Sequence, residues 1–83
     1  MAEPNPKELF NLGVKSNKAK DYIQAKKYFE KACNLNYGGG CGNLGVLCQN
    51  GQGVEKDLTK AAQFYSKACK LGDQEACEAL KEK

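Results

Sequence analysis

Apolar residues recur at steps of three and four along residues 21–34, and lysines occupy much of the opposite face. This spacing is typical of an amphipathic helix, and Asp21 stands where an N-cap is expected. The same pattern restarts at Asp57 and stops near Gly72, a residue type that is common just after a helix C-terminus. The apolar positions are Tyr22, Ala25, Phe29, Ala32 and Cys33 in the first segment, and Leu58, Ala61, Ala62, Phe64, Tyr65, Ala68 and Cys69 in the second. The sequence therefore predicts two amphipathic helices.

A shorter helix is predicted ahead of each of these, roughly over Pro6–Asn17 and Gly40–Gln49. Each contains a glycine in its interior, Gly13 and Gly45, which costs about 1 kcal/mol of helix stability relative to alanine. We expect a neighbouring helix to approach closely at these two points. The tail, residues 74–83, has apolar positions on one side and charged positions on the other, and is predicted to form a last helix that caps the structure.

The chain is also internally repetitive. A shift of 36 residues superposes identical residues in the two halves, and a second match, residues 11–14 with 43–46, has a spacing of 32. The four-residue difference comes from the longer loop Asn50–Lys56, in which Gly51 and Gly53 permit a positive φ. The superposed identical pairs are Asp21 with Asp57, Ala25 with Ala61, Lys31 with Lys67, Ala32 with Ala68, Cys33 with Cys69, Leu35 with Leu71, Cys41 with Cys77 and Leu44 with Leu80.

These motifs resemble Sel1-like repeats, which are relatives of tetratricopeptide repeats. The resemblance rests on Leu-Gly in the first helix, the paired aromatics in the second, the loop Asn-Gly-Gln-Gly-Val-Glu-Lys-Asp, and Lys-Ala-Cys-x-Leu followed by a second cysteine. The cysteine spacing further resembles the Helicobacter cysteine-rich proteins. The resemblance implies an all-α, short right-handed α-solenoid in a single domain, 1–83, with repeats over 6–37 and 38–73 and a capping helix over 74–83. Family members usually have more repeats, so we expect a truncated, minimised or engineered member.

Composition excludes several classes of function. The 83 residues include no His, Trp or Arg, so all thirteen cations are lysines, and the net charge is only +3. Histidine-dependent nucleophilic catalysis and mixed Cys/His zinc sites are thereby excluded. Lysines interspersed with ten acidic residues form a mixed surface, and no nucleic-acid partner is expected. No apolar segment approaches the roughly 20 residues of a membrane span, so no membrane partner is expected either.

Five cysteines remain to be explained, and four of them form two pairs with seven residues between the members. In each pair the first cysteine falls in the last turn of one helix and the second in the first turn of the next, close enough for a disulfide. The prediction is Cys33–Cys41 and Cys69–Cys77, with no metal and no cofactor. A four-cysteine zinc site and reduced core cysteines are the alternatives. Disulfides imply a periplasmic or secreted protein, and the first residues, 1–6, show no signal peptide.

The fifth cysteine, Cys48, has no partner at the repeat spacing. One interpretation is a packing residue on the first helix of the second repeat. The other is an exposed thiol that joins two chains, since an unpaired cysteine in an oxidising setting favours intermolecular pairing. A homodimer through Cys48 or through exposed repeat faces is therefore a hypothesis.

The expected binding surface is the concave face, lined by the first helix of each repeat. In tetratricopeptide domains, which the chain resembles, an asparagine just before Leu-Gly binds the backbone of a peptide, and the matching residues here are Asn11 and Asn43. An amide offers a donor and an acceptor together, as a peptide unit does. The alternative is that both asparagines cap or bridge helices. The remaining candidates on this face are Lys7, Phe10, Val14 and Val46. We expect a protein- or peptide-binding module whose ligand the sequence does not name.

The competing hypothesis is an enzyme, because some cysteine-rich relatives are associated with penicillin binding and β-lactamase activity. The serine enzymes of this kind use Ser-x-x-Lys. Here the two serines, Ser16 and Ser66, are followed three positions later by Ala19 and Cys69, and Lys-Thr-Gly is absent. The sequence therefore favours a protein that is not an enzyme.

Overall fold

The computed structural model describes residues 5–81, and this part of the chain is all-α. Two segments lie outside the described residues: residues 1–4, and residues 82–83, which are the last two of the predicted capping helix. The five helices are α1 (Pro6–Lys18), α2 (Tyr22–Asn34), α3 (Gly38–Asn50), α4 (Leu58–Lys70) and α5 (Gln74–Lys81). The predicted fold class is confirmed.

Side-chain caps fix where the helices begin. The carboxylate of Asp21 accepts a hydrogen bond from the backbone N–H of Gln24 at 3.2 Å, and that of Asp57 accepts one from Lys60 at 2.9 Å. The predicted cap Asp21 is thus confirmed, and Asp57 caps the second amphipathic helix in the same way. Such caps satisfy N–H groups that have no partner within the helix. The two amphipathic helices therefore start at equivalent positions.

The helix α3 is longer than its sequence pattern predicts, since it begins at Gly38 rather than Gly40. Glycines have low helix propensity, so the three glycines in the first turn of α3 make its sequence resemble that of a loop. Close packing against α2 explains them: a β-carbon at position 40 would lie 2.8 Å from Cβ of Ala32 and 3.0 Å from the backbone nitrogen of Cys33. Tertiary packing overrides propensity here.

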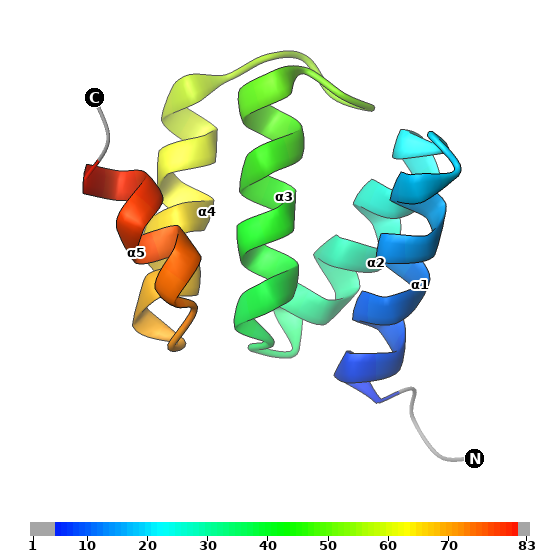
Figure 1. Cartoon of the computed structure of the whole chain (residues 1–83), viewed down its shortest axis with the longest axis horizontal. Helices are drawn as coiled ribbons and strands as arrows, with labels where there is room; N and C mark the ends of the chain where they lie inside the picture. Colours follow the sequence, from blue (N-terminus) through cyan, green and yellow to red (C-terminus); the bar gives the residue numbers. More distant parts are fainter. Residues whose placement is uncertain (1–4, 82–83) are drawn as a thin grey trace.

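The helices form two layers, with α1, α3 and α5 in one and α2 and α4 in the other (Figure 1). Each helix packs against its neighbours in sequence, and the assembly measures 43 × 25 × 16 Å. The two interior glycines mark the closest approaches, as predicted. A β-carbon at Gly13 would lie 2.5 Å from the ring of Phe29, and one at Gly45 would lie 2.9 Å from the ring of Tyr65. The same packing is thus repeated in both repeats.

The longer loop of the second repeat lies against the first repeat. Gly51 and Gly53 have φ values of 68° and 74°, as the sequence predicts. At Gly53 a β-carbon would lie 2.7 Å from the carbonyl oxygen of Tyr22, so the loop contacts the start of α2. The four extra residues therefore connect the two repeats as well as the two helices.

Three leucines at equivalent repeat positions show how the layers bury their core. Leu44 on α3 is 2% exposed, whereas Leu12 on α1 is 43% exposed and Leu80 on α5 is 38% exposed. The central helix lies between α2 and α4, whereas each outer helix packs mainly on one neighbour. Within residues 5–81, no helix is both long enough and apolar enough to cross a membrane.

Candidate functional site

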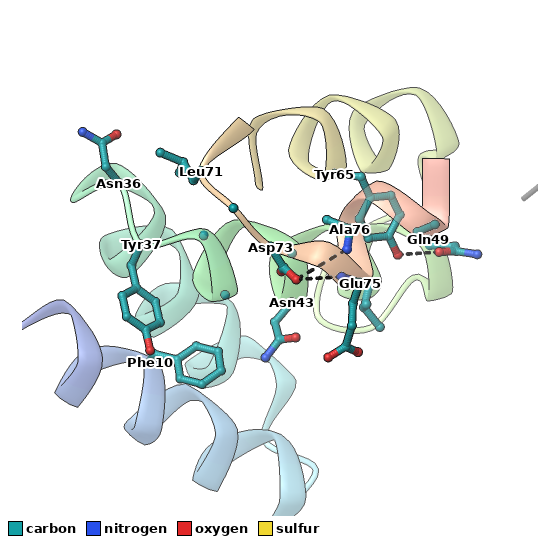
Figure 2. A pocket seen from close by; sticks show the side chains of 16 residues that line it. Phe10, Asn36, Tyr37, Asn43, Gln49, Tyr65, Leu71, Asp73, Glu75 and Ala76 are labelled. Carbon is teal, nitrogen blue, oxygen red and sulfur yellow. Dashed lines mark hydrogen bonds between the residues drawn. The ribbon is translucent and has the colours of Figure 1, made fainter. Parts of the chain in front are cut away.

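A cavity of about 690 Å³ lies on the face formed by α1, α3 and α5, which we call the concave face. The central helix α3 provides its floor, and the turns before α3 and α5 close one end (Figure 2). The lining residues are Phe10, Asn36, Tyr37, Gly38, Gly39, Gly42, Asn43, Val46, Gln49, Tyr65, Leu71, Gly72, Asp73, Glu75, Ala76 and Ala79. The three helices of this layer thus contribute to one site.

Three of the six residues predicted from sequence line this cavity, namely Phe10, Asn43 and Val46. The other three lie on α1 outside it. Lys7 and Asn11 are exposed, and Val14 is partly buried against the core cluster that contains Phe29 and Leu47. Because α1 contributes only the Phe10 side chain to the lining, the cavity lies closer to α3 and α5 than the sequence pattern indicates.

The floor of the cavity carries no charge. All thirteen residues of α3 are uncharged, and Gly39 and Gly42 line the cavity beside Asn43. The space that a side chain at position 42 would need is occupied by Oδ2 of Asp73. A narrow strip of α3 with an amide, small residues and Val46 is chemically suited to lie along a peptide backbone.

The Asn43 amide is available to a ligand. Among residues 5–81, no hydrogen bond engages the side chain of Asn43 or of Asn11. Neither asparagine therefore caps or bridges helices within the described part of the chain. Asn43 is half-buried in the cavity, so its donor and acceptor groups face the space that a ligand would occupy.

Aromatic rings form one wall of the cavity. Phe10 and Tyr37 stand with their ring centroids 5.2 Å apart, at an interplanar angle of 45°. Both rings also crowd Gly39, where a β-carbon would lie 3.1 Å from Phe10 and 3.2 Å from Tyr37. The pair presents an apolar surface with one hydroxyl group next to the uncharged floor.

Carboxylates form the opposite wall. The Oδ1 atom of Asp73 accepts hydrogen bonds from the backbone N–H groups of Glu75 at 3.1 Å and Ala76 at 3.5 Å, which caps α5. Glu75, in the first turn of α5, is exposed. In Figure 2 the side chains of Asn43 and Glu75 extend to the same side of the cavity, away from the capped end of α5.

Sequence reasoning missed this wall and much of the rest of the site. Gln49, whose Oε1 accepts a hydrogen bond from the Tyr65 hydroxyl at 2.6 Å, lies three residues, about one turn, beyond Val46 on α3. That periodicity could have identified it. The capping position just before α5 could have identified Asp73. Tyr37 and Asn36 lie in a turn, and their place in the cavity depends on how α3 packs on α1, which no local pattern encodes.

Both predicted disulfides are present. Cys33 is bonded to Cys41 and Cys69 to Cys77, with Cα–Cα distances of 4.6 and 4.7 Å. Each joins the end of one helix to the first turn of the next, within the range that disulfides require. The pairing rules out both alternatives, since bonded sulfurs are neither thiolate ligands of zinc nor reduced core thiols. The bonds fix the two turns that close the end of the cavity.

Cys48 is free and only 3% exposed. It belongs to the core cluster that contains Tyr65, Ala61 and the first disulfide. Burial raises the pKa of its thiol, and the nearby Lys60 opposes that shift only in part. These observations agree with the packing interpretation. An interchain bond through Cys48 would require the groups that cover this thiol to move, so the exposed thiol considered from sequence does not match this structure.

Comparisons with known proteins identify the repeats. The Sel1 repeat family model matches residues 9–37 and 40–73. HcpC of Helicobacter pylori (strain J99) is 63% identical over 60 residues, which cover 72% of this chain and 21% of that protein. "Beta-lactamase HcpA" of the same strain is 56% identical over 64 residues, covering 77% of this chain and 26% of its own length.

One solved structure extends the similarity to three dimensions. The Helicobacter pylori cysteine-rich protein B superposes with a TM-score of 0.84 at 35% identity, over 90% of this chain and 59% of that one. The present chain spans about a quarter or less of the length of the two relatives described above.

Proposed function

Because this chain belongs to the Sel1 repeat family, we propose that it is a protein-interaction module whose concave face binds an extended peptide segment. Sel1 repeats serve protein–protein interaction, and stacked helix pairs use the face formed by their first helices for binding. We further propose that it works in an oxidising compartment, periplasmic or extracellular, because its two disulfides persist only where thiols are not kept reduced.

The observation that carries the proposal is the unpaired Asn43 amide on the uncharged floor of a cavity of about 690 Å³. A peptide unit has one N–H and one C=O, and the Asn43 side chain can donate to the one and accept from the other. Val46, 41% exposed on the same helix face, offers apolar contact beside it. Amide and apolar surface alternate along α3, as an extended chain with alternating side chains requires.

Selection of random decapeptides displayed on phage, with the oxidised protein as target, tests the proposal. Selected peptides are then synthesised with acetylated N-termini and amidated C-termini and measured by titration calorimetry. We expect Asn43→Ala to weaken binding about three- to tenfold, the effect of one or two lost hydrogen bonds. Asn17→Ala, an exposed asparagine on α1 outside the cavity, is the matched control and leaves affinity unchanged. Equal affinity of wild type and Asn43→Ala would refute the proposal.

A second candidate function is β-lactam hydrolysis, which the name of the relative HcpA suggests. The residues on the concave face do not support this function. Neither serine lines the cavity, and its charged lining residues, Asp73 and Glu75, repel a β-lactam carboxylate. We therefore expect the purified protein to show no nitrocefin turnover. Turnover that persists through purification and disappears with a point mutation in this chain would establish the enzyme instead.

A further inference from the structure

The lysines of residues 5–81 lie outside the cavity, most of them on helices of both layers. The helices α2 and α4 carry six lysines: Lys26, Lys27, Lys31, Lys60, Lys67 and Lys70. The lining of the cavity contains two carboxylates, Asp73 and Glu75, and no lysine, although lysine is the most abundant charged residue of the chain. A chain with a net charge of +3 therefore presents its binding cavity as a locally negative surface.

The carboxylates face an aromatic wall across the α3 floor. The Asp73 carboxylate uses Oδ1 to cap α5 and places Oδ2 over Gly42. Glu75, two residues further along in the first turn of α5, is exposed on the side to which Asn43 points (Figure 2). Phe10 and Tyr37 stand on the other side of the floor. The cavity thus offers aromatic surface on one side of its floor, negative charge on the other, and an amide on the floor itself.

This combination fits a long cationic side chain. The methylene stem of a lysine or arginine packs on apolar and aromatic surface while its charged head is held by carboxylates. An acidic segment would be repelled, and a purely apolar one would make no favourable contact with the two carboxylates.

We propose that the segment bound on the concave face carries a lysine or arginine, with its charged head at Glu75 and Asp73 and its stem against the wall formed by Phe10 and Tyr37. The inference rests on the proposed function and adds the chemical class of the partner. It attributes specificity to the α5 end of the site and backbone recognition to Asn43.

The phage-selected decapeptides test the inference separately from the proposed function. We expect lysine or arginine at one fixed position relative to an apolar residue. We expect two changes to weaken binding about two- to fivefold each, the range of an exposed ion pair. One replaces the peptide's lysine by norleucine, and the other is Glu75→Gln in the protein. The two changes together cost less than the product of the separate losses, since either removes the same interaction. Binding of the wild type also weakens as salt rises.

Glu78→Gln is the matched control, because Glu78 lies on α5, is exposed and does not line the cavity. It makes the same charge change, and we expect no loss of affinity. Peptides that bind through Asn43 without enrichment of lysine or arginine would overturn the inference and leave the proposed function standing. Equal losses for Glu75→Gln and Glu78→Gln would overturn it as well. A selection that yields no peptide dependent on Asn43 would overturn both.

Discussion

The α2–α3 and α4–α5 junctions are closed by the same covalent device but differ in their surroundings. In each, two cysteines eight positions apart are bonded with nearly equal Cα–Cα distances. At the first junction the cysteines are 2% and 0% exposed, whereas at the second both Cys69 and Cys77 remain partly accessible. The difference lies in position along the stack, because α3 is packed from two sides and α5 from one.

The three leucines at equivalent repeat positions show the same difference in burial between the centre and the ends of the stack. Leu44 is covered by helices on both sides, and Leu12 and Leu80 are each left half-open at an end of the stack. In a repeat stack each unit gains most of its stability from its neighbours. The comparison teaches that equivalent sequence positions need not have equivalent energies. The central junction supports the fold, and the terminal junction, which carries Asp73 and Glu75, supports the binding site.

Removal of the buried disulfide is expected to have the largest effect. Closing a loop of this size stabilises by about 2–3 kcal/mol in the chain-entropy model, and loss of well-packed sulfur adds to this. We expect Cys33→Ala/Cys41→Ala to lower the free energy of unfolding by about 3–5 kcal/mol, and Cys69→Ala/Cys77→Ala by about 2–3 kcal/mol. Guanidinium unfolding followed by circular dichroism measures both. Equal losses would show that the two junctions are energetically equivalent.

Substitutions at the three equivalent leucines measure the contribution of packing to stability, separately from that of the disulfide bonds. Leu44→Ala is expected to cost about 2–5 kcal/mol, because it leaves a cavity between α2, α3 and α4. Leu12→Ala and Leu80→Ala, the matched substitutions at the two ends, are expected to cost less than about 1 kcal/mol each. The same unfolding measurement applies. A cost at Leu80 as large as that at Leu44 would mean that α5 is covered in solution by something outside residues 5–81.

Cys48 tests whether the core beside the first disulfide is apolar throughout. Cys48→Ser places a hydroxyl in this core, and we expect it to cost about 1–2 kcal/mol, more than Cys48→Ala. Because burial raises the pKa of the thiol, it stays protonated and unreactive at neutral pH. Labelling with iodoacetamide should therefore be slow until the protein is unfolded. Rapid labelling, or a reducible dimer on non-reducing gels that Cys48→Ser abolishes, would restore the interchain interpretation.

The smallest effect concerns the binding site. The accessible Cys69–Cys77 bond should be reduced about tenfold faster than Cys33–Cys41, as alkylation and mass spectrometry would show. Its reduction loosens the turn that positions Asp73, so peptide affinity should fall about threefold while most helical content remains. If the Cys33–Cys41 bond is reduced first, or if affinity is unchanged after selective reduction at the α4–α5 junction, the proposed division of roles is wrong.

Periodicity and repeat spacing predicted nearly the whole fold, because amphipathic spacing, the caps Asp21 and Asp57 and the paired cysteines are all local signals. The start of α3 was missed, since its glycine run has low helix propensity, and the close packing of Gly40 on Ala32 and Cys33 is a tertiary contact that no local pattern encodes. The site was predicted in part. Phe10, Asn43 and Val46 follow from helix faces, whereas Tyr37 and Glu75 belong to it only through the way α1 and α5 stack on α3.

The most direct test of the account is a map of backbone amide chemical shifts as a selected decapeptide is added to the oxidised protein. The account predicts perturbations concentrated at Phe10 on α1, at Gly39, Asn43 and Val46 on α3, and at Glu75 and Ala79 on α5, with α2 and α4 little affected. Perturbations concentrated on the lysine-bearing outer faces of α2 and α4 would contradict it.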